Sequence, residues 1–553
     1  MNSNWTKKIL FRMVLPVRYV KVAVLLLMPL LLGLSCVLIS RKKFFDNDEL
    51  YSYYLLSDPS FRHMWQSFND SINNSPPLYF AVGWIWAALF GSGETSLRLF
   101  SSLPMSFALL VMWRVLSGPF GNWASIIGLG LAFCTPTVVL GENATARPYG
   151  LFLACAALCV AAIARNELQL VSSRSFFINA VSFALLVQSH LFGTIYAAAL
   201  MAAQVLIDIR RGRLRPFIYI AMAAGVATFA LYLPVFFNQA ENGIPRAWIP
   251  PAFLQDLLQF YASIAPSGLP LLDSHSGSTL WIVMVIAGSL VAVLWPCRQE
   301  RAEVWRRQQH LLTVAWALLL VPIAVWFASW AMKPLFFNRY MIPSVLGLAI
   351  LYAAASCRFL RPMLSSADRR VRFRTRAAAG ALAALVGVTP LVWAQRFPAV
   401  PTPGSGDQQY GFDALPIVVP FSHAYLQRLH YSPNRGRYYF LLDWTTAVDP
   451  ASGDFAPQEY KELSALKRQY SSQFTTVVDH SVFFSLHPRF LVLRSLRSPH
   501  TCHVPLSYAE KWSNFHCWQV YDRRIAWDPR FRTTRLGPVD GEYELLLEER
   551  NEN

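Results

Sequence analysis

The chain has 553 residues, of which 54% are hydrophobic and only 15% are charged, and its formal net charge at pH 7 is +17. A water-soluble protein of this length divides into several cores and carries more charge, so the composition argues against one. Repeated apolar runs of about 17–22 residues, separated by basic clusters, instead predict a polytopic α-helical membrane protein. Basic cytoplasmic loops account for the positive charge. They contain no interleaved aromatic stacking platform, which argues against a nucleic acid partner.

The first apolar run, residues 20–39, is long enough to cross a bilayer. It has no clear small-residue cleavage site, so we expect a retained anchor rather than a signal peptide. The basic residues before it place the N-terminus in the cytoplasm, and they are Lys7, Lys8, Arg12, Arg18 and Lys21. Residues 40–94 then form the first outer loop. Within it, residues 77–90 are apolar but only about fourteen residues long, which predicts an interfacial helix rather than a span.

Later spans follow this loop. They are expected near residues 95–116, 123–140, 149–164, 175–190, 192–208, 216–236, 280–296, 311–331, 340–357 and 378–394. The basic links 210–215, 298–307 and 358–376 then lie on the same side of the membrane as the N-terminus. This arrangement requires about eleven transmembrane helices and leaves the C-terminus outside.

The last part of the chain has mixed charge and no spanning run, so we expect a membrane domain, 1–394, and a periplasmic domain, 395–553. Short β-branched or aromatic stretches alternate there with helical patterns, which is typical of a small α/β domain. The predicted strands are 416–420, 437–442 and 489–493, and the predicted helices are 422–429 and 458–468.

Three carboxylates, those of Asp46, Asp48 and Glu49, follow the first span and lie at the membrane surface. Carboxylates at that position do not help to hold a helix in lipid, so they are candidates for a chemical function. In an irregular loop, Asp48 and Glu49 can serve different tasks. One can accept a proton from a hydroxyl while the other positions a ligand or a metal. The structural alternative is that Asp46 or Asp48 caps a short helix over residues 49–56, and both interpretations can hold for different residues.

Two arginines, Arg147 and Arg339, lie at predicted outer span boundaries, and Tyr149 and Tyr340 follow them. Lys333 precedes Arg339 in the same segment. An arginine at a lipid–water boundary suits a lipid phosphate, because its guanidinium can donate two parallel hydrogen bonds. The alternative is a pair of anchors that extend to the interface beside an aromatic belt. Both arginines share a face with the acidic loop, which favours phosphate binding.

The order of these segments resembles a known family. A first span followed by Asp48-Glu49, and then by Asn74-Ser-Pro-Pro-Leu-Tyr79, is similar to bacterial glycosyltransferases with the multi-spanning C-type fold. Those enzymes are relatives of the protein O-mannosyltransferases, the lipid A aminoarabinose transferase and the lipopolysaccharide galacturonosyltransferases. The resemblance covers about residues 20–395. Further landmarks are residues 90–91, 97–102, 146–149, 189–193 and 337–343.

The resemblance implies inverting transfer of a sugar from a polyprenyl-phosphate donor, on the periplasmic face of a bacterial inner membrane. The acceptor would be an envelope lipid, glycan or protein. Asp48 would be the general base, with Glu49 assisting it. Family members hold the lipid phosphate with basic residues, and some add a divalent metal ion. The candidates for phosphate binding here are Arg339, Arg147 and Lys333, and those for substrate binding are Tyr79, Tyr149, Tyr340 and His190.

One segment departs from the family pattern. The residues before Arg-Pro-Tyr usually read Ser-Gln-Glu-Ala, whereas this chain has Asn143-Ala-Thr-Ala146. Glu142 lies three residues earlier than the expected carboxylate, so the resemblance assigns it no role. His190 also has a structural alternative, because a lone histidine at a span end is more often a buried interfacial residue than a ligand.

Two other functions fit a polytopic protein of this kind. One is a transporter or flippase for a lipid-linked sugar, and the other is a non-catalytic protein whose outer domain binds an envelope polymer. Transporters tend to place ionisable residues at mid-membrane depth and to show inverted halves. The acidic residues of this chain lie in outer loops instead, which favours sugar transfer.

Overall fold

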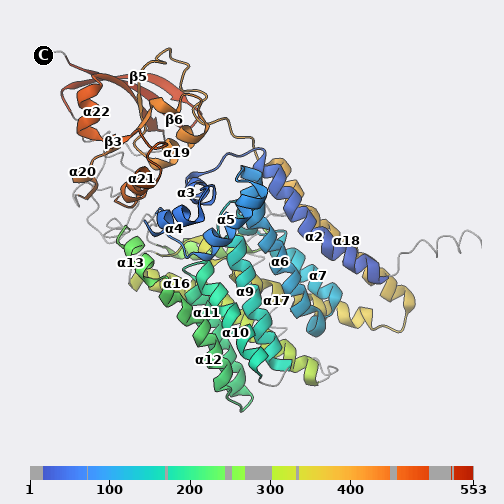
Figure 1. Cartoon of the computed structure of the whole chain (residues 1–553). Coiled ribbons are helices and arrows are strands. Elements are labelled where there is room, and N and C mark those ends of the chain that lie inside the picture. The colour runs from blue at the N-terminus through green and yellow to red at the C-terminus, as the bar shows by residue number, and fades with distance from the viewer. Residues whose placement is uncertain are drawn as a thin grey trace, which may run out of the picture.

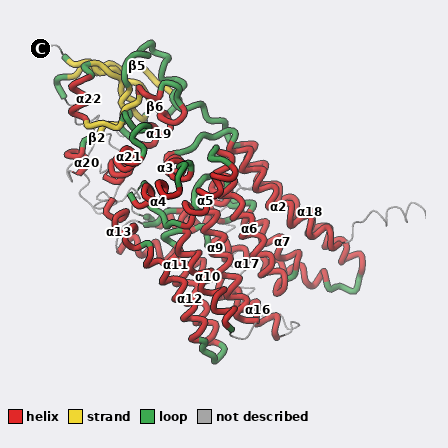
Figure 2. The backbone as a smooth tube through the Cα atoms, in the orientation of Figure 1, coloured by secondary structure: helices red, strands yellow, loops and turns green. Residues whose placement is uncertain are grey.

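The computed structural model describes residues 17–70, 72–168, 172–242, 252–267, 302–331, 335–448, 457–496, 525 and 528–551. Over these residues the protein is a helical bundle joined to a smaller sheet-containing domain (Figure 1). Figure 2 shows that the strands gather in the C-terminal domain, while the rest of the described chain is helical. The predicted fold class, a multi-pass membrane protein with a C-terminal α/β domain, is confirmed.

The bundle contains most of the predicted spans. Its helices are α2 (Val17–Ser40), α6 (Glu94–Phe120), α7 (Asn122–Phe133), α9 (Tyr149–Leu168), α10 (Ser173–Ser189), α11 (Gly193–Arg210), α12 (Pro216–Ala227), α16 (Ala302–Ala331), α17 (Ser344–Leu364) and α18 (Arg369–Arg396). Six helices of the described chain are long and apolar enough to cross a membrane, or seven if one bent pair counts as a span. The predicted span 280–296 lies outside the described residues.

Two predicted spans are interrupted. The segment 123–140 is wrong as a single helix, because α7 ends at Phe133 and a short helix α8 (Thr137–Glu142) follows Pro136. The twelve residues of α7 extend only about 18 Å, less than the hydrocarbon core of a bilayer. The segment 216–236 is bent by 53° between η1 (Thr228–Leu231) and α13 (Leu233–Asn242). Prolines explain both breaks, since proline disfavours helix at the preceding residue and lacks an N–H.

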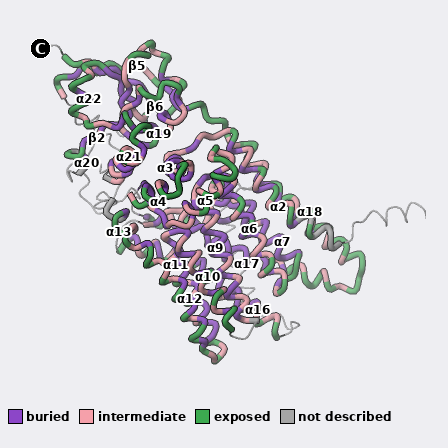
Figure 3. Tube along the Cα trace, viewed as in Figure 1, coloured by how far each residue is buried: buried purple, intermediate pink, exposed green. Residues whose placement is uncertain are grey.

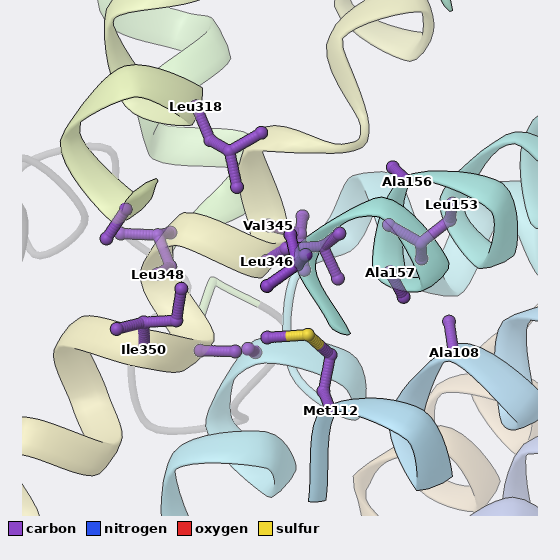
Figure 4. Packing of buried hydrophobic residues seen from close by; sticks show 14 of the residues in the cluster. Ala108, Met112, Leu153, Ala156, Ala157, Leu318, Val345, Leu346, Leu348 and Ile350 are labelled. Carbon is purple, nitrogen blue, oxygen red and sulfur yellow. The ribbon is translucent and has the colours of Figure 1, made fainter. Parts of the chain in front are cut away.

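Small side chains let the bundle helices approach closely. Figure 4 shows Ala156 and Ala157 of α9 near Ala108 and Met112 of α6 within the buried core. At the start of α9, a Cβ on Gly150 would lie 1.8 Å from the carbonyl oxygen of Ser101 in α6. Only glycine permits this contact. The same contact fixes the end of α9 that carries Tyr149, at the end of the bundle next to the C-terminal domain.

The outer surface of the bundle is apolar. Figure 3 shows buried positions along its interior and exposed positions on the outside of the helices. Leu30 of α2, Phe177 of α10 and Leu385 of α18 are large apolar side chains on that exposed surface. An extended apolar surface of this kind is unusual in a soluble protein and is expected where helices face lipid.

Three short helices of the first outer loop lie between the bundle and the C-terminal domain (Figure 1). They are α3 (Asn47–Leu56), α4 (Phe61–Asn69) and α5 (Leu78–Phe90). The thirteen residues of α5 match the predicted interfacial segment 77–90, and the helix is too short to span a bilayer.

The C-terminal domain contains a six-stranded sheet with the order β3-β2-β1-β4-β6-β5. The first four strands of this order pair in parallel, and β6 pairs antiparallel with both β4 and β5. The strands are β1 (Ile417–Val418), β2 (Tyr438–Leu442), β3 (Val477–Asp479), β4 (Arg489–Ser495), β5 (Phe531–Val539) and β6 (Tyr543–Arg550). The predicted strands are confirmed as β1, β2 and β4. The predicted helices are confirmed as α19 (Ser422–Tyr431) and α21 (Pro457–Gln469).

The two faces of this sheet are buried by different partners. Val418 and Leu441 pack with Phe483 of α22 (His480–Leu486) on one face. Ile417 and Phe440 belong to a cluster on the other face that includes residues of α19 and α21. That second cluster continues into α3, α4 and α5 of the first outer loop. The C-terminal domain and the outer loop therefore share one hydrophobic core.

Candidate active site

The start of α3 determines where the acidic residues point. Asp46 is the N-cap, and its Oδ1 accepts a hydrogen bond from the Glu49 amide at 2.9 Å. The Glu49 carboxylate accepts in turn from the Asp46 amide at 3.0 Å, which completes a capping box. The capping interpretation is therefore confirmed for Asp46. Asp48 lies in the first turn of the same helix and is not needed for the cap.

Glu49 is fully buried and binds Arg98 of α6. Arg98 Nε and Nη2 lie 2.8 Å from the two carboxylate oxygens of Glu49, and the Ala146 amide donates to the same carboxylate at 2.7 Å. Burial alone would raise the pKa of Glu49, but Arg98 and then Lys43 outweigh it and lower the pKa to about 2. The carboxylate joins α3 to α6 and to the segment before α9. Its predicted assisting role would act through the position of Asp48, because Glu49 is inaccessible to a substrate.

Asp48 meets both predicted arginines. Arg339 Nη2 lies 2.5 Å from Asp48 Oδ2, and Arg147 Nη2 lies 3.9 Å from the same oxygen. Arg147 Nη1 also donates to the Asp48 carbonyl oxygen at 3.0 Å. Burial would raise the pKa of Asp48, but Arg147, Arg339 and His423 together lower it. The Asp48 side chain is 33% exposed and that of Asp46 is 32% exposed, but the Asp46 carboxylate caps the helix, so Asp48 is the accessible carboxylate that remains available for a reaction.

Two aromatic rings make cation–π contacts with the Arg339 guanidinium. Its central carbon lies 4.8 Å from the centre of the Phe337 ring and 5.6 Å from that of Tyr149. Tyr149 and Tyr340 stack with their ring centres 6.4 Å apart. Cation–π contacts of this kind stabilise a desolvated cation without neutralising it. Arg339 therefore keeps its charge for an anionic ligand. Lys333 lies outside the described residues.

His190 packs behind this cluster. Its ring stacks on Phe152 with the centres 4.7 Å apart, and it contacts Tyr340 at 5.3 Å. Its Nδ1 accepts a hydrogen bond from the Phe192 amide at 3.2 Å. Burial, then Arg147 and Arg339, lower the pKa of His190 to about 3. The imidazole is therefore neutral at physiological pH, and at 6% exposure it lies inside the aromatic cluster.

Tyr79, a predicted substrate-binding residue, lies in the protein interior and not on an accessible surface. It is fully buried in α5, and its hydroxyl lies 3.4 Å from Ser101 Oγ. Ser101 Oγ donates to the carbonyl oxygen of Arg147 at 2.9 Å. Tyr79 therefore supports the backbone of Arg147 from behind, whereas direct substrate contact stays a prediction.

Several buried polar atoms around this cluster have no hydrogen-bond partner among the described residues. They are Arg147 Nε, Tyr149 Oη, Glu142 Oε2, Asn73 Nδ2 and Asn74 Oδ1. Buried polar groups are nearly always hydrogen-bonded in folded proteins, so a group of donors and acceptors of this kind indicates a ligand site. Glu142, to which the sequence assigned no role, is one of them. Burial raises its pKa to about 7, although Arg339 and Lys43 oppose the shift.

The C-terminal domain adds polar residues that the sequence did not identify. Glu462 of α21 accepts a hydrogen bond from Asn74 Nδ2 at 3.1 Å. Ser422 of α19 donates to Asn47 at 3.4 Å, and its amide donates to Glu459. These residues lie more than 370 positions from the loop that they contact. The spacing of Glu459 and Glu462, which places both on one face of a helix, is the only local signal for them.

No group of three or more His, Cys, Asp or Glu side chains in the described ranges is arranged to hold a metal ion. The predicted divalent metal therefore has no ligand set among these residues and stays a prediction. The positive charge beside Asp48 comes from Arg147 and Arg339.

An apolar cavity of about 380 Å³ lies between α4, α5, α10 and η1. Its lining includes Trp65, Leu78, Leu185, Leu231 and Tyr232. Leu78 is the neighbour of Tyr79 in α5, so the cavity lies beside the helix that supports Arg147. An apolar lining with few polar groups suits a hydrocarbon chain.

No protein-family model and no curated protein sequence matches the chain. Among solved structures it is similar to ArnT from Cupriavidus metallidurans in the apo state, with a TM-score of 0.55 and 12% identity. That match covers 94% of this chain and 97% of ArnT. It is also similar to ArnT from the same organism bound to undecaprenyl phosphate, with a TM-score of 0.52, 13% identity and coverage of 95% and 97%. The chain therefore has the multi-spanning C-type fold of these glycosyltransferase structures, as the sequence resemblance predicted.

Proposed function

We propose that this protein transfers a sugar from a polyprenyl-phosphate donor to a hydroxyl of an envelope lipid, glycan or protein. The transfer would proceed with inversion on the periplasmic face of a bacterial inner membrane. One observation carries the proposal. An accessible carboxylate, Asp48, and two guanidinium groups, Arg147 and Arg339, meet at the end of the bundle next to the C-terminal domain.

The arginines bind the donor phosphate in this proposal. A guanidinium donates two parallel hydrogen bonds to phosphate, and a buried arginine keeps its charge. Arg147 Nε is a donor without a partner among the described residues, so hydrogen-bonding capacity remains for a ligand. The similar ArnT structure with undecaprenyl phosphate supports a lipid phosphate as the ligand. The apolar cavity beside α5 is a candidate position for part of the prenyl chain.

Asp48 is the general base. While it pairs with Arg147 and Arg339 its pKa is lowered, which makes it a weak base. A donor phosphate competes for both guanidinium groups and adds negative charge nearby, and both effects raise the pKa of a carboxylate. Donor binding thereby prepares Asp48 to accept the proton of the attacking hydroxyl. The two arginines then stabilise the charge that develops on the leaving phosphate.

A transfer assay tests the proposal. Membranes containing the full-length protein are incubated with a panel of radiolabelled undecaprenyl-phosphate sugars and an envelope extract from a strain lacking the protein. Label that moves covalently from the lipid phosphate into an envelope component supports the proposed function. Label that only crosses the membrane on its original carrier identifies a transporter or flippase. If neither occurs with any sugar of the panel, the protein is non-catalytic.

A further inference from the structure

The helix α21 is held against the first outer loop at two points. In its middle, Glu462 Oε1 accepts a hydrogen bond from Asn74 Nδ2 at 3.1 Å. At its end, Arg468 binds the Asp70 carboxylate with Nη2 at 2.7 Å and Nε at 3.1 Å. The helix also packs in the core that the two regions share. The position of Glu462 is therefore fixed by an interface between the C-terminal domain and the loop that carries Asp48.

Glu462 has hydrogen-bonding capacity left at this interface. The side chain is 8% exposed, and its two hydrogen bonds, from Asn74 and from Gln458 at 2.9 Å, both reach Oε1. Oε2 has no partner within the described chain. Asn74 Oδ1 is buried and also lacks a partner among those residues. Two oxygen atoms without a hydrogen-bond partner among the described residues, one from each region, therefore lie at this interface.

The groups around Glu462 belong to the candidate active site. Asp48 and Tyr51 of α3 interact electrostatically with it, as do Glu459 of its own helix and Arg147 before α9. Burial raises the pKa of Glu462, and Asp48 and Glu459 raise it further, whereas the Gln458 hydrogen bond and Arg147 lower it. The result is a pKa of about 8, so the carboxyl group is mostly protonated at neutral pH. A protonated carboxyl can both donate to a hydroxyl and accept from one.

We propose that Glu462 binds the acceptor hydroxyl, so that the C-terminal domain supplies the acceptor side of the active site. The inference rests on the proposed sugar transfer and identifies the acceptor group as an alcohol hydroxyl, which can both donate a hydrogen bond and accept one. That hydroxyl forms hydrogen bonds with Glu462 and Asn74 at the interface between the two regions, and it faces Asp48. Its oxygen forms the new bond to the anomeric carbon, and its proton passes to Asp48. The bond from that carbon to the phosphate oxygen breaks, and the phosphate leaves as an anion bound by the arginines.

The test compares Glu462→Leu with wild type as full-length protein in lipid nanodiscs, because leucine cannot form the proposed hydrogen bonds. A labelled undecaprenyl-phosphate sugar is held at saturation, and the envelope extract is titrated as the source of acceptor. We expect the half-saturating amount of extract to rise about tenfold, as for loss of one hydrogen bond to a charged or strongly polar group. The transfer rate of the wild type should change with pH near 8, where Glu462 titrates, and this change should be absent from the variant. The affinity of the variant for undecaprenyl phosphate should stay within about twofold of the wild type. Glu462→Gln, whose amide can donate to and accept from a hydroxyl but does not titrate, should recover part of the extract affinity without the pH response.

Two further variants separate acceptor binding from a structural role. Glu549→Gln removes an exposed carboxylate that pairs with Arg489 elsewhere in the same domain, and it should change nothing. Asn74→Leu removes the hydrogen bond between Asn74 and Glu462 and leaves the Glu462 carboxyl group in place. If Asn74→Leu reproduces the whole defect, including the loss of the pH response, Glu462 is only a structural tie and the inference is overturned.

Failure of this inference can be told from failure of the proposed function. Wild-type transfer with an unchanged half-saturation and pH profile in Glu462→Leu overturns the role of Glu462 alone. Wild-type protein that binds undecaprenyl phosphate but transfers no sugar overturns the transferase proposal, and the acceptor role of Glu462 with it.

Discussion

Arg339 Nη2 lies 2.5 Å from Asp48 Oδ2, although 291 positions separate the two residues in the chain. The contact joins the first outer loop to the segment before α17. A carboxylate and a guanidinium at this distance neutralise each other, so the site contains its own counter-ion. A phosphate that enters must replace Asp48 at the arginines, and this replacement couples donor binding to the activation of the base.

Asp48→Asn should remove the general base while keeping the shape of the side chain. We expect the transfer rate to fall by about 10²–10⁴, the usual contribution of a general base. The initial rate with a labelled donor measures the effect. Asp413→Asn, at a 62% exposed side chain of the C-terminal domain, is the matched control and should retain wild-type activity. Full activity in Asp48→Asn would remove the assignment of the base.

Arg339→Ala should weaken use of the donor. Loss of one group that stabilises developing charge commonly costs about 10²–10³ in rate. Arg339→Lys keeps the charge but loses the planar fork, so its rate should lie between those of wild type and the alanine variant. Binding of undecaprenyl phosphate to purified protein, together with the transfer rate, measures both effects. Arg376→Ala, at the end of the basic link 358–376 and in the first part of α18, should leave both unchanged. An equal loss there would indicate a general effect of positive charge.

Glu49→Gln should lower the stability of the fold rather than remove a group that takes part in the reaction. Breaking a buried ion pair by removing one partner costs about 3–5 kcal/mol, because it leaves the Arg98 charge buried without compensation. We expect a clear fall in the unfolding temperature of the purified protein. The double variant Glu49→Gln/Arg98→Met should recover part of the loss, since it leaves no unpaired charge. If Glu49→Gln is as stable as wild type yet inactive, Glu49 has a direct part in the reaction.

Glu142 should make stability depend on pH. Its pKa is raised from an ordinary value of 4.5 to about 7 in the folded protein, mainly by burial. The stabilisation is therefore fully present below pH 4.5 and is lost as the pH rises through 7. The unfolding temperature of wild type should fall between pH 5 and pH 8 through this group, and that of Glu142→Gln should fall less. Identical pH profiles for the two proteins would contradict the shift.

The sequence predicted the central part of the site because its determinants are local. Asp48, Arg147 and Arg339 each lie next to the end of a hydrophobic run, and the alternation of basic links placed all three on one side. Their contact then follows from the bundle. The acidic triplet also contained its own structural partner, since Asp46 and Glu49 have the spacing of a capping box.

Residues whose role depends on tertiary packing could not be predicted. Glu462 lies in an ordinary amphipathic helix, and only the shared core brings that helix to Asn74. Two other features do have local signals in the sequence. Pro136 and Pro234 mark the interruptions of the predicted spans. Asp540 and Gly541, both with positive φ, mark the turn between β5 and β6, and an Asp-Gly pair is a strong hairpin signal.

The core that the C-terminal domain shares with the first outer loop has a consequence for dissecting the protein. The connection from residue 397 to residue 416 is not what keeps the two regions together, because Phe45, Tyr54 and Phe68 pack in one cluster with residues of α19 and α21. Limited proteolysis within that connection would nick the polypeptide without releasing either fragment. A version shortened at residue 395 would instead expose the hydrophobic side chains of the first outer loop to water, so a stable fragment has to retain both this loop and the C-terminal domain.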